Sequence, residues 1–150
     1  MNFRPGWGGS EANILDAFSK MDFDDNCDFK VLLTGQVIRT TNSSEIAKNA
    51  GITFGHEPCG NRPIVLSTAA LASEHLLSHE FGHAVGWYDT VHPMVNPETG
   101  QKDPMHSGLP LNLMGYNDDP RIQDQLKADD QWCRRLCKCA EKRTDERNAE

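Results

Sequence analysis

The stretch from His79 to Asp89 constrains the fold of this chain most, and it reads H-E-x-x-H-x-x-G-x-x-D. On a helix, His79 and His83 are four residues apart and therefore lie on the same face, one turn from each other. Two imidazoles at that spacing can both reach one Zn²⁺ ion, and Glu80 stands beside the first of them without being a ligand. Gly86 accepts φ > 0 at no steric cost, so the helix can end there. The stretch predicts an amphipathic helix that carries a metal site.

A third ligand is expected shortly after the glycine. Asp89 follows Gly86 by three residues, so its carboxylate can turn back towards the two histidines, and His92 is its rival three residues further on. Three protein ligands leave a fourth position open, which is typical of a catalytic rather than a structural zinc. His106 is interpreted as a loop residue, with a role in substrate or metal binding as the lesser alternative.

A second motif lies downstream, where residues 111–116 read L-N-L-M-G-Y. The two motifs together resemble the zinc signature and the Met-turn of metzincin-clan zinc metalloproteases. The ending in Asp89 is similar to snapalysin-like small bacterial proteases, in which an Asp is the third zinc ligand. The resemblance implies that Met114 lies beneath the metal as a hydrophobic base. It also implies that Tyr116 hydrogen-bonds a developing oxyanion or loosely ligates the resting metal.

Length and composition limit the class of protein. The 150 residues predict a single catalytic domain over 1–150, with an irregular N-terminus over 1–9 and a polar tail over 142–150. A net charge of −7 argues against a nucleic-acid partner, because phosphate binding needs a basic face. The sequence contains no run of about 18 apolar residues, so it predicts no membrane span. We expect a secreted protein, or one delivered out of the producing cell, although no signal peptide is seen.

The pattern of apolar residues predicts a small zincin-like or metzincin-like α+β domain. Its parts are a twisted mixed sheet, an N-terminal helix, an active-site helix, a Met-turn and a C-terminal helix. Residues 90–110 are rich in Pro and Gly without an apolar period, which predicts a long loop that lines the substrate cleft. The expected elements are a helix over 11–21, strands over 29–38, 52–55 and 63–68, the active-site helix from about residue 73, and a helix from about residue 120 to 141.

Five cysteines leave at least one unpaired within the chain. The favoured interpretation is one or two disulfides that join Cys27 or Cys59 to the group formed by Cys133, Cys137 and Cys139. Free thiols in a reducing compartment are the next alternative. A second zinc site built on the C-terminal group is the third, although C-x₃-C-x-C is not a familiar zinc spacing.

The function predicted from these features is that of a zinc-dependent endopeptidase. Glu80 would take the proton of a metal-activated water and deliver it to the leaving amine, acting as base and acid in turn. The expected partner is a polypeptide substrate that lies extended along a sheet edge. The resemblance implies that this edge is the strand over 63–68. A protein inhibitor or immunity protein is a further possible partner. The chain is expected to be a monomer. Two alternatives stay open: a secreted toxin or effector protease with a narrow target, and a zinc amidase that acts on a non-protein amide.

Overall fold

The computed structural model describes residues 20, 29–35, 38–39, 48–49, 51–53, 59, 63–67, 73–116, 120–123 and 125–149. The predicted N-terminal irregular segment, almost all of the predicted helix over 11–21, and Cys27 lie outside the described residues. Within the described part, strands and helices form a small α+β fold with a mixed sheet, as the sequence predicted.

Three strands form the main sheet in the order β1-β5-β4. β1 (Lys30–Thr34) runs parallel to β5 (Pro63–Ser67), and β4 (Gly51–Thr53) runs antiparallel to it. β5 is buried from its second residue to its last, as expected of an apolar strand with a neighbour on each side. The strand predicted over 63–68 is therefore the middle of the sheet rather than the expected substrate edge.

Two further pairs of strands are short. β2 (Ile38–Arg39) pairs antiparallel with β3 (Lys48–Asn49). β6 (Pro93–Val95) and β7 (Lys102–Ser107) form an antiparallel hairpin. This hairpin lies where the sequence predicted a long loop. Its strands contain prolines and exposed polar residues, so they carry no alternating apolar pattern by which they could be recognised.

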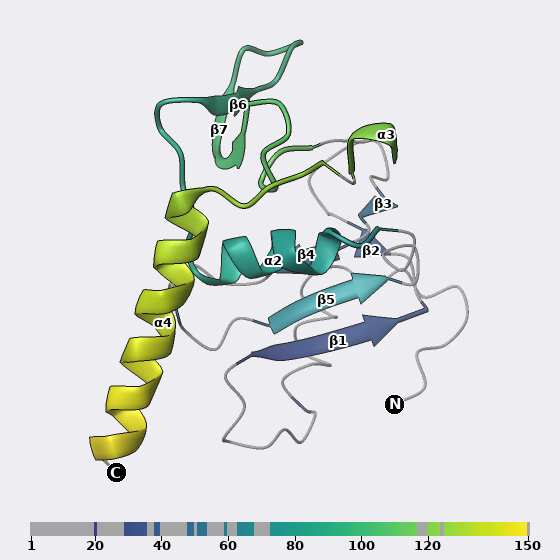
Figure 1. Cartoon of the computed structure of the whole chain (residues 1–150). Coiled ribbons are helices and arrows are strands. Elements are labelled where there is room, and N and C mark those ends of the chain that lie inside the picture. Colours follow the sequence, from purple (N-terminus) through teal and green to yellow (C-terminus); the bar gives the residue numbers. More distant parts are fainter. Residues whose placement is uncertain are drawn as a thin grey trace.

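The helix α2 (Leu76–Ala84) packs against β4 and β5. Figure 1 shows it lying across one face of the sheet, with the β6–β7 hairpin on the side of the helix away from the sheet. α2 begins three residues later than predicted, and no side chain caps its first turn. The contact between helix and sheet buries Ile64, Leu66 and Ala84, with Phe29, Leu76 and Phe81 packed around them.

α2 ends at Gly86 as the sequence predicted. Gly86 has φ of 75°, and its N–H donates to the carbonyl of His83 at 3.0 Å. The N–H of Trp87 donates to the carbonyl of Gly82 at 2.9 Å. These two bonds form a Schellman motif, which satisfies the last carbonyls of the helix and turns the chain sharply. The chain after α2 is thereby directed towards the hairpin.

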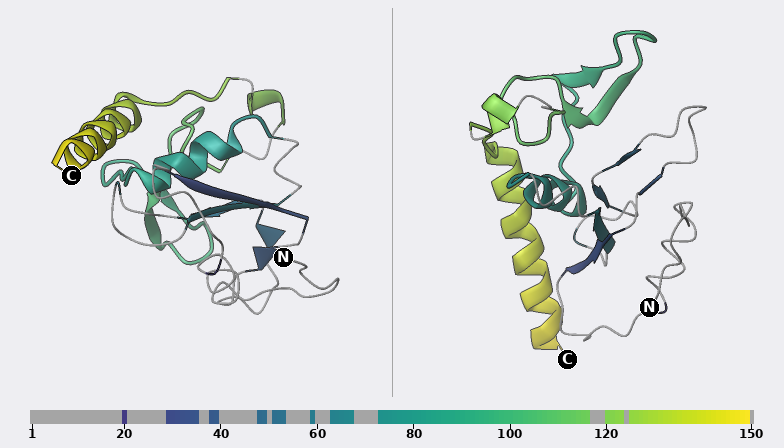
Figure 2. Two further views of the ribbon diagram at one scale, coloured as in Figure 1. Left: turned by 90° about the horizontal axis from the view of Figure 1, so that it is seen from below. Right: turned by 90° about the vertical axis from the view of Figure 1, so that its right-hand side faces the viewer.

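The C-terminal part contains two helices, α3 (Pro120–Gln123) and α4 (Asp130–Ala149), where the sequence predicted one. Asp129 accepts a 2.8 Å hydrogen bond from the N–H of Trp132 and so caps the start of α4. α4 continues through the region expected to be a frayed polar tail. Figure 2 shows it running past one end of α2 and the sheet. Among the described residues, no helix combines the length and apolar character needed to cross a bilayer.

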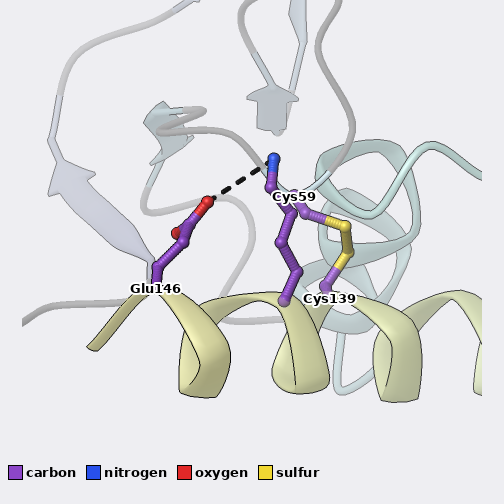
Figure 3. Close-up of a disulfide and its surroundings, with 4 residues drawn as sticks. Cys59, Cys139 and Glu146 are labelled. Atoms are coloured by element: carbon purple, nitrogen blue, oxygen red, sulfur yellow. Dashed lines mark ion pairs between the residues drawn. A yellow bond between two sulfur atoms is a disulfide. The ribbon is translucent and has the colours of Figure 1, made fainter. Parts of the chain in front are cut away.

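A disulfide joins Cys59 to Cys139 across 80 residues of sequence (Figure 3). This confirms the interpretation in which Cys59 pairs with the C-terminal group. Cys139 is the buried residue of α4, whereas Cys133 and Cys137 are free and exposed. A second zinc site that uses Cys139 is therefore wrong. In the next turn of α4, the Lys142 ammonium lies 3.7 Å from a carboxylate oxygen of Glu146.

Candidate metal centre

His79 and His83 project from α2 towards the same point, as the sequence predicted. Both side chains are buried, and their Nε2 atoms lie 3.1 Å apart. Two nitrogens that bind one tetrahedral Zn²⁺ at about 2.0–2.1 Å would be about 3.3 Å apart. The two imidazoles are therefore already spaced as a pair of metal ligands.

The third member of the cluster is His106 on β7. One nitrogen from each of His79, His83 and His106 lies within 4.8 Å of the others, and these are the only such trio of His, Cys, Asp or Glu among the described residues. The His106 ring lies 5.4 Å from that of His79 and 4.9 Å from that of His83, measured between centroids. The three histidines can together hold a metal ion.

Hydrogen bonds fix which nitrogen two of these rings offer. Nδ1 of His79 lies 2.7 Å from the carbonyl oxygen of Leu113, so Nδ1 is the donor. Nδ1 of His106 likewise donates to the Oδ2 of Asp103 at 2.6 Å. In each neutral ring Nε2 is then unprotonated and can bind a metal. The described residues thus fit a metal ion through both their spacing and their tautomers.

Burial keeps His79 neutral. Its pKa falls from 6.5 to about 4, chiefly because burial desolvates the ring; the Leu113 carbonyl opposes this shift and the nearby His106 adds to it. Because a metal binds only the neutral imidazole, His79 is ready to act as a ligand at any pH well above this value. No proton has to be displaced from it at neutral pH.

The predicted Met-turn lies directly under α2. Met114 is fully buried, and a Cβ built at Gly82 would collide with its sulfur atom. Its neighbour Leu113 supplies the carbonyl that orients His79, and the Met114 carbonyl accepts from the N–H of Ser107, beside His106. The Met-turn therefore supports two of the three histidines through backbone bonds.

Glu80 lies beside the cluster and faces β4. Its side chain is buried, and Oε2 lies 2.6 Å from the hydroxyl of Thr53. Burial raises the pKa of Glu80 to about 7, against the lowering effect of the Thr53 bond. The same hydroxyl lies 3.0 Å from the Glu80 carbonyl. Thr53 is the donor in both contacts, so its one hydroxyl proton is shared between the side-chain Oε2 and the backbone carbonyl of Glu80.

Asp89 and His92, the predicted third ligand and its rival, lie outside the histidine cluster. The Oδ1 of Asp89 accepts from the backbone N–H groups of Val91 and His92 at 2.8 and 3.0 Å. The N–H of Asp89 donates to the carbonyl of Pro104 on β7 at 2.9 Å. His92 is an exposed loop residue whose Nδ1 lies 4.0 Å from Asp89. Asp89 thus shapes the turn between α2 and β6, and its N–H ties this turn to β7, the strand that bears His106.

Tyr116 also lies at the cluster. Its ring stacks on that of His106, with centroids 4.2 Å apart, and lies 6.3 Å from that of His79. The side chain is otherwise largely exposed. Tyr116 therefore lies beside two of the three histidines.

The sequence favours Asp89 over His106 as a ligand, because nothing in residues 90–110 predicts the strand that carries His106. One local signal was present: Asp103 precedes His106 by three residues, a carboxylate within reach of an imidazole. Comparisons of the chain with protein-family models, with curated proteins and with solved structures gave no match. The structure contains a group of three histidines, His79, His83 and His106, that can hold a metal ion.

Proposed function

We propose that this chain is a zinc-dependent endopeptidase with His79, His83 and His106 as ligands and Glu80 as general base and acid. The observation that carries the proposal is the convergence of three buried or half-buried imidazoles beside a buried glutamate. Three histidines and an open fourth position are typical of catalytic zinc. The resemblance of residues 79–89 and 111–116 to metzincin motifs supports the same function.

The residues around the site provide the parts that hydrolysis of an amide requires. Bound zinc would supply Lewis acidity, which acidifies a coordinated water and polarises a carbonyl. Glu80 takes the proton of the attacking water and later gives it to the leaving nitrogen. A pKa of about 7 suits both tasks, although a bound cation would favour the ionised form and lower this value. Tyr116 is exposed at the cluster and donates to the developing oxyanion.

β4 is the strand on which an extended substrate would lie. Among the described strands it pairs with β5 alone, so its other edge is unpaired in the sheet order. Thr53 on this strand contacts Glu80, which places the edge next to the proposed base. A peptide that adds to β4 would gain main-chain hydrogen bonds and bring its own amides close to Glu80.

The test compares Glu80→Gln with Glu74→Gln, the same change at an exposed position six residues earlier, before α2 begins. We expect both variants to bind one zinc per chain, measured by elemental analysis. Only Glu80→Gln should lose cleavage of a proteome-derived peptide library, by at least about 100-fold, because general base catalysis contributes that much. Retained cleavage in Glu80→Gln would contradict its assignment as base.

The same experiment separates the alternative functions. Cleavage of many peptides supports a general endopeptidase, and cleavage of a single protein with none in the library supports a toxin or effector of narrow target. If the zinc-loaded chain cuts neither but hydrolyses peptidoglycan amides, the endopeptidase proposal is wrong and the site is that of an amidase. Binding of no zinc would remove the proposal altogether.

A further inference from the structure

Asp103 holds His106 in a defined orientation. Its Oδ2 accepts the Nδ1–H of His106 at 2.6 Å, and its Oδ1 accepts the backbone N–H of Met105 at 3.0 Å. The carboxylate is thus fixed at both oxygens by residues of its own strand. The His106 side chain is 12% exposed and that of Asp103 is 40% exposed. The hydrogen bond therefore forms at the rim of the cluster, with its imidazole end largely shielded from water.

We infer that Asp103 is a positioning residue of the metal centre, one that sets the tautomer and the direction of His106. This inference rests on the proposed function, because it takes His106 to be a metal ligand. An isolated neutral imidazole carries its proton on either nitrogen. A carboxylate at Nδ1 keeps the proton there and leaves Nε2 free for the metal.

The group that orients His106 is a side chain, whereas the group that orients His79 belongs to the backbone. His79 is oriented by a backbone carbonyl, which no substitution at Leu113 would remove. His106 stands on a two-stranded hairpin rather than on α2, so its approach to the cluster depends on contacts outside the helix. A side-chain carboxylate and the stacked ring of Tyr116 provide these contacts.

The substitution Asp103→Asn tests the role sharply. The asparagine Oδ1 can still accept the Met105 N–H and keep the local turn. Its amide group would then face Nδ1 of His106 as a donor, which favours the tautomer with the proton on Nε2. We expect zinc affinity to fall by about 10- to 100-fold, as is typical when a partner of a metal ligand is lost. Asp145→Asn, the same change at an exposed position on α4, is the matched control.

Two measurements on the intact chain are needed. Zinc affinity is obtained by competition with a chromophoric chelator, and the His106 tautomer in the metal-free protein is read from ¹⁵N chemical shifts of its ring. If Asp103 served only the local turn at Met105, Asp103→Asn would leave the zinc affinity and the His106 tautomer unchanged. Asp103→Ala, which removes both contacts, should give a mixed tautomer and an affinity below that of the wild type.

His106→Ala separates failure of this inference from failure of the metal centre. If His106→Ala loses zinc while Asp103→Asn keeps wild-type affinity and the Nδ1–H tautomer, Asp103 is not a positioning residue and the metal centre stands. If His106→Ala binds zinc as tightly as the wild type, His106 is not a ligand, and both the three-histidine centre and the role of Asp103 are wrong. A lower affinity together with a changed tautomer in Asp103→Asn supports the inference.

Discussion

The carboxylate of Asp89 is engaged by its own loop. One of its oxygens accepts two backbone N–H groups, from Val91 and His92, in an Asx-turn. Its backbone N–H is bonded to the carbonyl of Pro104, two residues before His106. Asp89 therefore contributes to the histidine cluster through the path of the chain, by bringing β7 alongside the end of α2. Its position three residues after Gly86 is explained by this turn without any bond to a metal.

The two roles of Asp89 predict different results for Asp89→Asn. Asparagine accepts the same N–H groups and preserves the turn, so we expect zinc content within about twofold of the wild type. A ligand role would instead cost the metal a charged oxygen, and zinc would be lost. His106→Ala should lose zinc under the same dialysis. The measurement is zinc per chain after dialysis against a weak chelator; loss in Asp89→Asn with retention in His106→Ala would show that the predicted ligand was right.

The local spacing of residues thus predicted part of the site. His79 and His83 were predicted because helix geometry alone places them on one face, and Glu80 was predicted from its place next to His79 in the motif. The end of the helix at Gly86 was predicted because few other residues tolerate its φ of 75°. The place of His106 could not be predicted in the same way, because it depends on the pairing of β6 with β7, and these strands show no apolar alternation in the sequence.

Among the elements, the contact between α2 and the Met-turn determines the geometry of the centre. Asp129, at the start of α4, accepts from the indole N–H of Trp87 at 3.0 Å and from the side-chain amide of Asn112 at 3.2 Å. It thereby connects the end of α2, the Met-turn and α4. The side-chain oxygen of Asn112 accepts from the N–H of Met114 at 2.9 Å, which fixes the turn itself. The sequence predicted each element, but not the residue that joins them.

Gly82→Ala tests this contact. Alanine favours a helix over glycine by up to about 1 kcal/mol. Its Cβ would nevertheless collide with the Met114 sulfur and lie 2.9 Å from Cδ1 of Trp132. Overpacking typically costs about 1–3 kcal/mol, so we expect a net loss of about 1–2 kcal/mol in the free energy of unfolding in urea. Zinc affinity should also fall, because the Met-turn carries the carbonyl that orients His79.

Gly35→Ala is the control for that substitution. No atom of the described residues lies within 4 Å of a Cβ built at Gly35, so the stability of Gly35→Ala should stay within about 0.5 kcal/mol of the wild type. If Gly82→Ala proves as stable as Gly35→Ala or more so, the Met-turn has room to shift, and the close packing under α2 does not constrain the site.

At the scale of the molecule, a disulfide among the described residues connects the sheet region to α4. The Cys59–Cys139 bridge joins the segment between β4 and β5 to the middle of α4, and the N–H of Cys59 also donates to the Ala84 carbonyl at the end of α2. A loop of 80 residues corresponds to roughly 4 kcal/mol of loop-closure entropy removed from the unfolded chain. This stabilisation offsets part of the free-energy cost of burying polar and ionisable side chains such as His79, Glu80 and His83.

Two of those buried groups give the metal-free protein opposite dependences on pH. Glu80 has a folded pKa of about 7, above 4.5 in the unfolded chain, so its contribution to stability is complete below pH 4.5 and is lost as the pH rises through 7. His79 has a folded pKa of about 4, below 6.5, so its contribution is complete above pH 6.5 and is lost as the pH falls through 4. Between about pH 4.5 and 6.5 the two slopes oppose each other and largely cancel.

In Glu80→Gln the contribution of Glu80 to the pH dependence of stability is absent, so the opposing contribution of His79 should become visible. With a chelator present, the free energy of unfolding of Glu80→Gln relative to the wild type should rise by about 3 kcal/mol between pH 4.5 and 7, because a pKa difference of one unit corresponds to about 1.4 kcal/mol. For Glu74→Gln, a change at an exposed residue, the free energy of unfolding should depend on pH as it does in the wild type. Saturating zinc should shrink the difference, since a nearby cation favours the ionised glutamate. If urea unfolding gave parallel curves for all three proteins without metal, Glu80 would be solvated, and burial would not be what prepares it to exchange a proton near neutral pH.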